Sequence, residues 1–152
     1  MKKVSVIFIG LFLLCICSIT RADDMKKLIM GYEAASSIEK QQLWSEITSY
    51  MNKSLPMSVD SETTIENIAP LRNGLTFRYR MDNYDRTDVP KEEWILIIQE
   101  VKENMKNRFC TDPESTLLKD LNALIKCKYY DKSGKYIDAF SFFANDCDKE
   151  LF

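Results

Sequence analysis

Histidine is absent from all 152 residues of the sequence, which removes the commonest catalytic and metal-binding arrangements. Without an imidazole there is no Ser-His-Asp or Cys-His nucleophile pair, and no histidine-ligated zinc. Only four glycines are present, and none belongs to a glycine-rich loop of the kind that cradles phosphates. There is also no Cys-x-x-Cys motif, which argues against thiol–disulfide exchange.

Paired carboxylates remain as a route to catalysis, because an acidic hydrolase needs only two carboxyl groups. The pairs in this chain are predicted to lie in a helix turn or a surface turn, where a structural role accounts for them. The loop 82–88 holds three aspartates spaced by three, whereas a calcium loop alternates its ligands and places a glycine among them. We therefore predict that the protein is not an enzyme and holds no metal and no cofactor. The carboxylate pairs are Glu92 with Glu93 and Asp146 with Asp148.

Long apolar runs are also missing, except at the N-terminus. A short basic start precedes the apolar run Val4–Ile19, and small residues follow it. This order is typical of a secretory signal peptide, here over residues 1–22. The alternative is an uncleaved anchor, but the run is shorter than the roughly 20 residues that a membrane span needs. We predict a periplasmic or secreted protein whose mature chain starts at Asp23 and forms a single domain over residues 23–152.

Two cysteines lie inside this leader and raise the question of a lipid anchor. A bacterial lipoprotein has a small residue before its lipidated cysteine, whereas Leu14 precedes Cys15 and Ile16 precedes Cys17. Lipidation is therefore disfavoured, and one acyl chain would be only part of a stable anchor. We expect no stable membrane anchor.

Charge argues against nucleic acid as a partner. The chain has 21 basic and 23 acidic residues, and loss of three basic residues with the leader leaves 18 against 23, a formal charge of −5. Nucleic-acid binding depends on an excess of basic residues.

Hydrophobic periodicity predicts an α+β domain, with an antiparallel four-stranded sheet and helices packed on one face of it. Asn73-Gly74 and Ser133-Gly134 provide the turn signals between paired strands. The elements expected in chain order are a helix over 37–55 capped by Ser36 or Ser37, a strand over 57–69, a strand over 75–81, a helix capped by Asp88 and running to Phe109, a short helical turn over 115–121, and strands over 124–130 and 136–143.

Three cysteines remain in the mature chain, and export predicts one disulfide and one leftover thiol. Cys127 alternates with Ile125 and Tyr129 on one face of a strand, which predicts a buried free thiol. The expected disulfide is therefore Cys110–Cys147, which clamps the helix to the last hairpin. In the loop-closure model it stabilises the fold by roughly 3–4 kcal/mol.

The same stretch resembles a known family. The run Phe109-Cys110-Thr111-Asp112-Pro113, the pair Leu117-Leu118, the turn Asp131–Gly134 and the final Cys147 are similar to the C-terminal half of small exported bacterial proteins, among them the pilotins of some type II secretion systems. The resemblance covers roughly the last third of the chain, with a weaker echo at Leu55-Pro56. It implies the same fold, the same cysteine pairing and a role in escorting a secretin. Pilotins are lipoproteins, and in this respect the chain departs from them.

Basic residues mark a candidate binding surface. Arg78 and Arg80 alternate outward on one predicted strand, as Lys126 and Lys128 do on another. If the two strands are neighbours, these four residues form a basic patch that can steer an acidic partner to an otherwise acidic protein. The alternatives are an ordinary solvated sheet face, a sheet edge that accepts a strand from a partner, and the helical stripe around Trp44.

Two functions fit these observations. The first is an accessory or chaperone-like component of an envelope secretion or pilus assembly. The second is a periplasmic immunity protein that inhibits a toxin or enzyme acting in that compartment. In both cases the partner is another envelope protein, and the sequence leaves the oligomeric state open.

Overall fold

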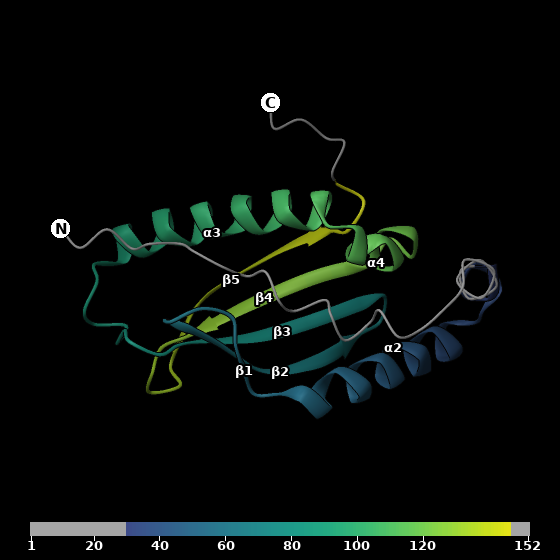
Figure 1. The fold of residues 1–152 in the computed structure, drawn as a ribbon, viewed down its shortest axis with the longest axis horizontal. Coiled ribbons are helices and arrows are strands. Elements are labelled where there is room, and N and C mark those ends of the chain that lie inside the picture. The colour runs from purple at the N-terminus through teal and green to yellow at the C-terminus, as the bar shows by residue number, and fades with distance from the viewer. Residues whose placement is uncertain (1–29, 147–152) are drawn as a thin grey trace.

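The computed structural model describes residues 30–146, apart from the side chains of Arg108 and Glu114 (Figure 1). The predicted leader, its cleavage site and Cys147 lie outside these residues, so the cleavage and the Cys110–Cys147 pairing stay predictions. Within residues 30–146, no helix has both the length and the apolar character that crossing a membrane requires.

The described chain forms an α+β fold built on one five-stranded mixed sheet, in the order β1-β2-β3-β4-β5. A helical segment at residues 30–34 precedes the first complete element. The elements in chain order are α2 (Ser37–Met51), η1 (Asn52–Ser54), β1 (Met57–Ser58), β2 (Thr63–Leu71), β3 (Gly74–Met81), α3 (Lys91–Thr111), η2 (Pro113–Ser115), α4 (Thr116–Asp120), β4 (Leu124–Tyr130) and β5 (Tyr136–Phe143).

The predicted four-stranded antiparallel sheet is wrong in two respects. The expected strand over 57–69 divides into β1 and β2, which form a hairpin in which Met57 pairs with Ile65. In addition, β3 and β4 are parallel neighbours. The physical reason is the connection between them. Helix α3 carries the chain back along the sheet, so β4 starts at the same end as β3 and runs in the same direction.

The helix boundaries confirm one predicted cap and correct the other. Ser36 caps α2 in a capping box, because its hydroxyl accepts a hydrogen bond from the Glu39 N–H and the Glu39 carboxylate accepts one from the Ser36 N–H at 2.7 Å. Asp88 does not cap α3, which begins at Lys91. Its carboxylate instead accepts a hydrogen bond from the Asp85 N–H at 2.9 Å, within the preceding loop.

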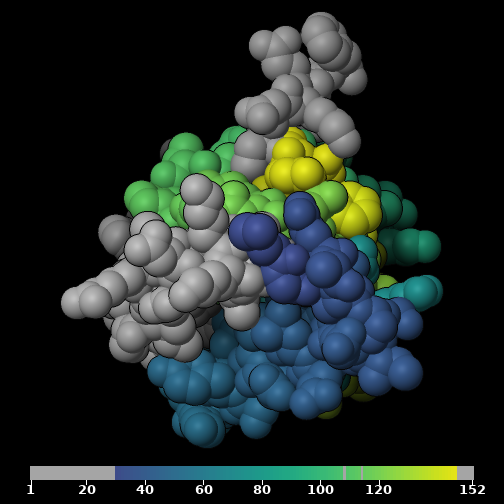
Figure 2. Space-filling model, turned by 90° about the vertical axis from the view of Figure 1, so that its right-hand side faces the viewer, coloured from purple at the N-terminus to yellow at the C-terminus, as the bar shows by residue number. Residues whose placement is uncertain are grey.

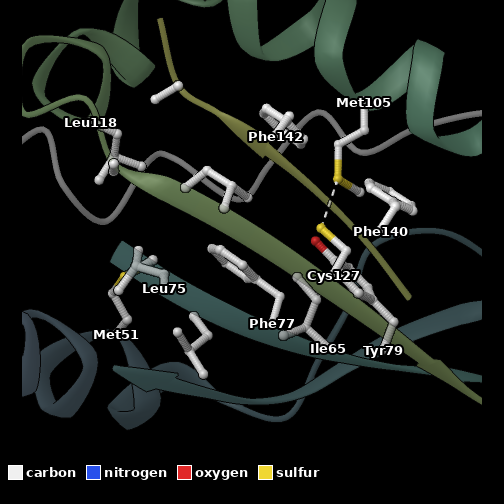
Figure 3. Close-up of a cluster of buried hydrophobic side chains, with 14 of the residues drawn as sticks. Met51, Ile65, Leu75, Phe77, Tyr79, Met105, Leu118, Cys127, Phe140 and Phe142 are labelled. Atoms are coloured by element: carbon white, nitrogen blue, oxygen red, sulfur yellow. Dashed lines mark hydrogen bonds between the residues drawn. The ribbon is translucent and has the colours of Figure 1, made fainter. Parts of the chain in front are cut away.

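Both long helices pack on one face of the sheet, α2 along the β2 side and α3 along the β5 side (Figure 1). Viewed from one end, the blue residues of α2 lie below the green and yellow residues of α4 and β5 (Figure 2). Trp44 and Met51 of α2 face the core, with Trp44 fully buried, whereas Tyr50 on the same helix is 43% exposed. Figure 3 shows Met105 of α3 pointing at Cys127 of β4, with 3.3 Å between the two sulfurs. Cys127 is a buried free thiol, as the sequence predicts.

Candidate partner-binding face

The face of the sheet opposite the helices, here called the outer face, carries the predicted basic residues. The parallel register sets Arg78 beside Lys128 and Thr76 beside Lys126. The strands that hold the four basic residues are therefore neighbours, as the patch requires. All four side chains are half-buried.

Two carboxylates bind the arginines of this face. Glu66, at a bulge in β2, accepts a hydrogen bond from Arg78 Nε at 2.6 Å and one from an Arg80 terminal nitrogen at 2.8 Å. Arg80 Nε also donates to Asp82 at 2.7 Å. The arginines are thus partly neutralised within the sheet, whereas Lys126 and Lys128 form no ion pair within residues 30–146. The four cations exceed the two carboxylates, so the face stays basic.

The Arg80–Asp82 pair holds both groups in their charged forms. The hydrogen bond to Asp82 is the main reason that the pKa of Arg80 lies above its ordinary value. Partial burial tends to raise the pKa of Asp82, but the hydrogen bonds from Thr64 and Arg80 outweigh this and leave the pKa below its ordinary value. The network therefore stays ionised at neutral pH.

A row of four contacting side chains, here called the transverse row, crosses the outer face from β2 to β5. Its members are Glu66, Arg78, Tyr130 and Tyr136. The Arg78 guanidinium carbon lies 3.5 Å from the centre of the Tyr130 ring. The Tyr130 and Tyr136 rings meet edge to face at 5.7 Å.

Three of these four residues, all except Arg78, were not predicted from the sequence. The period of two through Lys126 and Lys128 continues to Tyr130, so that residue could have been placed on the outer face. The bulge that presents Glu66 to both arginines left no signal in the sequence. Tyr136 could be assigned only once the register of β5 against β4 was known, because that register pairs it with Tyr130.

The two alternative binding surfaces fit the structure less well. The backbone N–H groups of Ala139 and Phe143 on β5 donate to the carboxylates of Asp138 at 2.7 Å and Asp146 at 3.2 Å. An added strand would need such donors, so these aspartates protect the β5 edge of the sheet. Trp44 is fully buried and cannot contact a partner unless α2 moves.

Within residues 30–146, the structure brings together no group of three or more His, Cys, Asp or Glu residues suited to a metal ion. Glu92 and Glu93 lie in the first turn of α3, as predicted, while Asp148 lies outside the described residues. Burial raises the pKa of Cys127, so its thiol is a poor nucleophile. An open depression of about 300 Å³ between α3 and β5 mixes Lys102 and Lys106 with the acidic residues Glu103 and Asp146.

Solved structures that share this fold include three bacterial proteins. A protein of Pseudomonas aeruginosa described as secreted matches with a TM-score of 0.59 and 13% identity, over 75% of this chain and 99% of its own. The type II secretion pilotin EpsS of Vibrio vulnificus matches with a TM-score of 0.59 and 16% identity, over 75% and 96%. The type II secretion pilotin AspS of Vibrio cholerae matches with a TM-score of 0.55 and 13% identity, over 77% of this chain and 100% of its own.

The TM-scores of 0.55 to 0.59 show a shared fold, and at identities of 13–16% they show the fold alone. The resemblance to pilotins, which the sequence indicates for its last third, is confirmed at the level of fold and extends over three quarters of the chain. No protein-family model matches the sequence, and no curated protein matches it.

Proposed function

We propose that this protein is a non-enzymatic accessory component of an envelope secretion assembly and that it acts by binding another envelope protein. The observation that carries the proposal is the fold, which the pilotins EpsS and AspS share over 96% and 100% of their own chains. Fold alone does not establish function, so the binding surface supplies the second argument.

The predicted signal peptide places the proposed function outside the cytoplasm. Cleavage after residue 22 and a mature start at Asp23 would place the chain in the periplasm or outside the cell. The Cys110–Cys147 disulfide would form in that oxidising environment. The described relatives of the same fold are a secreted protein and secretion-system pilotins, which fits this location.

The outer face is the surface that we assign to partner binding. It carries Arg78, Arg80, Lys126 and Lys128 on two neighbouring strands. Both long helices pack on the opposite face. An excess of positive charge on an acidic protein favours an acidic partner and speeds its association.

Affinity capture of the tagged, exported full chain from a periplasmic extract tests the proposal. We expect a component of a secretion assembly to be captured. Recovery of a toxin or a hydrolase would instead indicate the immunity role. A bait that enriches no envelope protein would contradict both forms of the proposal.

The variant for this experiment is Lys126→Glu with Lys128→Glu. Reversing Arg78 and Arg80 would place new carboxylates beside Glu66, so the unpaired lysines provide a safer test. We expect weaker capture, most clearly at low salt, because screening reduces the contribution of these charges. The matched control is Lys91→Glu with Lys102→Glu on α3, both exposed, which changes net charge equally and should capture normally.

A further inference from the structure

Arg78 is held in place by two neighbours and still has donors to offer. Glu66 binds its Nε at 2.6 Å, and the Tyr130 ring lies 3.5 Å below the guanidinium carbon. The two terminal nitrogens make no hydrogen bond within the described residues. One of them lies beside the turn after β4, 4.0 Å from where a side chain on Gly134 would begin.

We propose that the terminal nitrogens of Arg78 bind a carboxylate of an acidic segment of the partner protein, laid across β3, β4 and β5. This inference rests on the proposed function, because it specifies the chemistry of the segment that the partner contributes. A planar guanidinium presents two parallel donors that match the two oxygens of a carboxylate. A guanidinium already fixed by stacking and by an ion pair loses little freedom on binding.

The neighbours of Arg78 suit an acidic segment as well. Lys128 lies beside Arg78 in register, and Lys126 lies two residues earlier on the same strand. Neither lysine has an ion-pair partner within residues 30–146. Tyr136 is 46% exposed at the end of the transverse row, where it offers apolar surface to the same ligand.

The arrangement favours a protein segment over an anionic membrane surface. Glu66 and Asp82 lie among the four cations of the face, and a dense plane of lipid phosphates would repel both. A single extended segment can instead set one carboxylate against Arg78 and avoid these two groups.

Fluorescence anisotropy of a labelled peptide tests the proposal on the exported full chain. The probe is a short peptide of alternating glutamate and serine, and its neutral counterpart alternates glutamine and serine. We expect the acidic peptide to bind at low salt and the neutral one to bind far more weakly. Arg78→Lys keeps the charge but removes the paired donors, and it should weaken binding about tenfold.

Arg72→Lys is the matched control, because Arg72 is exposed in the turn between β2 and β3, away from the transverse row. It should bind the acidic peptide as the unmodified chain does. Melting temperatures are recorded for each variant. If Arg78→Lys lowers the melting temperature, Tyr130→Leu provides the second test, since it keeps Arg78 and removes the ring beneath it. That variant should also bind several-fold more weakly.

Unchanged peptide binding by Arg78→Lys and Tyr130→Leu would overturn the proposal, and so would failure of the acidic peptide to bind. Vesicles containing phosphatidylglycerol form a second arm. If Arg78→Lys loses vesicle binding but keeps peptide binding, Arg78 binds lipid, and this result would also overturn the proposal. The capture experiment distinguishes failure of this inference from failure of the proposed function. If the Arg78→Lys variant still captures the envelope partner, this inference is contradicted and the proposed function is unaffected.

Discussion

At the scale of single residues, Asp131 holds two loops together. It is fully buried, and one of its carboxylate oxygens accepts the N–H groups of Ser133 at 2.9 Å and Lys135 at 2.8 Å. The other oxygen accepts the N–H of Arg86 at 3.1 Å, from the loop that follows β3. The sequence predicted a turn at Asp131. It did not predict the bond to Arg86, because that partner is 45 residues away in the chain.

The pKa of Asp131 leads to a prediction about acid stability. Burial tends to raise this pKa, but the backbone N–H groups of Lys135, Arg86 and Ser133 outweigh it and lower the pKa below its ordinary value. Ionised Asp131 therefore stabilises the fold above its unfolded-state pKa of about 3.9. This contribution is lost as the pH falls through that value toward the lower folded-state pKa.

We expect Asp131→Asn to lower the melting temperature at neutral pH, and we expect the difference from the unmodified chain to narrow as the pH is lowered through about 4. The amide oxygen can still accept from Ser133 and Lys135, whereas the amide nitrogen would face the Arg86 N–H, donor against donor. Hydrogen exchange should therefore accelerate at Arg86 more than at Lys135.

Thermal melts across pH check this prediction, with Asp120→Asn as the control because Asp120 is exposed on α4. A difference between the unmodified chain and Asp131→Asn that stayed constant with pH would show that the charge of Asp131 contributes nothing.

At the scale of elements, the parallel contact between β3 and β4 is the part of the sheet that sequence analysis missed. The alternation in each strand was predicted correctly, and so was the long amphipathic helix between them. Pairing direction depends on the path of the connection, which local patterns do not encode. The two-residue strand β1 is too short to produce a periodic signal. The outer positions of Arg78 and Lys128 could be predicted, because they depend only on a local pattern. Side chains alternate between the two faces of a strand whether it pairs in the parallel or the antiparallel direction.

At Gly74 the backbones of these two strands approach closely. A Cβ at this position would lie 2.0 Å from the carbonyl oxygen of Leu124. The obstacle is backbone, so it cannot rotate away as a flexible side chain would. The neighbouring contact, Leu124 N–H to Asn73 carbonyl at 2.9 Å, also ties the start of β4 to the turn before β3.

We therefore expect Gly74→Ala to destabilise the fold by about 3 kcal/mol, at the upper end of the usual cost of overpacking. Urea denaturation measures the change. Gly31→Ala is the matched control, because nothing lies within 4 Å of its added Cβ and residue 31 is helical. That variant should be neutral or slightly stabilising, by up to about 1 kcal/mol. Equal midpoints for the two variants would contradict the close approach at Gly74.

At the scale of the whole molecule, the sheet separates two tasks. Its inner face and the helices form one core cluster, which includes Leu75, Ile125 and Phe140. Its outer face carries the charged network and the transverse row. This division was predictable from the sequence, because alternation assigns each side chain of a strand to one face. The sequence did not predict which charges pair across the outer face, because those contacts depend on strand order and on the bulge at Glu66.

The reactivity of Cys127 toward a thiol reagent measures how often the core opens, because its thiol lies inside the core between the sheet and α3. Cys127 is fully buried and contacts Met105 of α3. A thiol reagent must therefore wait for the helix and the sheet to separate. We expect Cys127 to be labelled slowly in the folded protein, at a rate that follows the population of the open state.

Met105→Ala should raise that rate. Truncating a buried methionine costs about 2–5 kcal/mol, and a loss of about 2 kcal/mol enlarges the open population about thirtyfold. Leu96→Ala on the same helix is the matched control, because Leu96 is 67% exposed and its truncation should leave the rate unchanged. Pepsin digestion with mass spectrometry isolates the Cys127 peptide from the other cysteines. Rapid labelling of Cys127 in the unmodified folded chain, or equal rates for the two variants, would mean that α3 does not seal this face of the sheet.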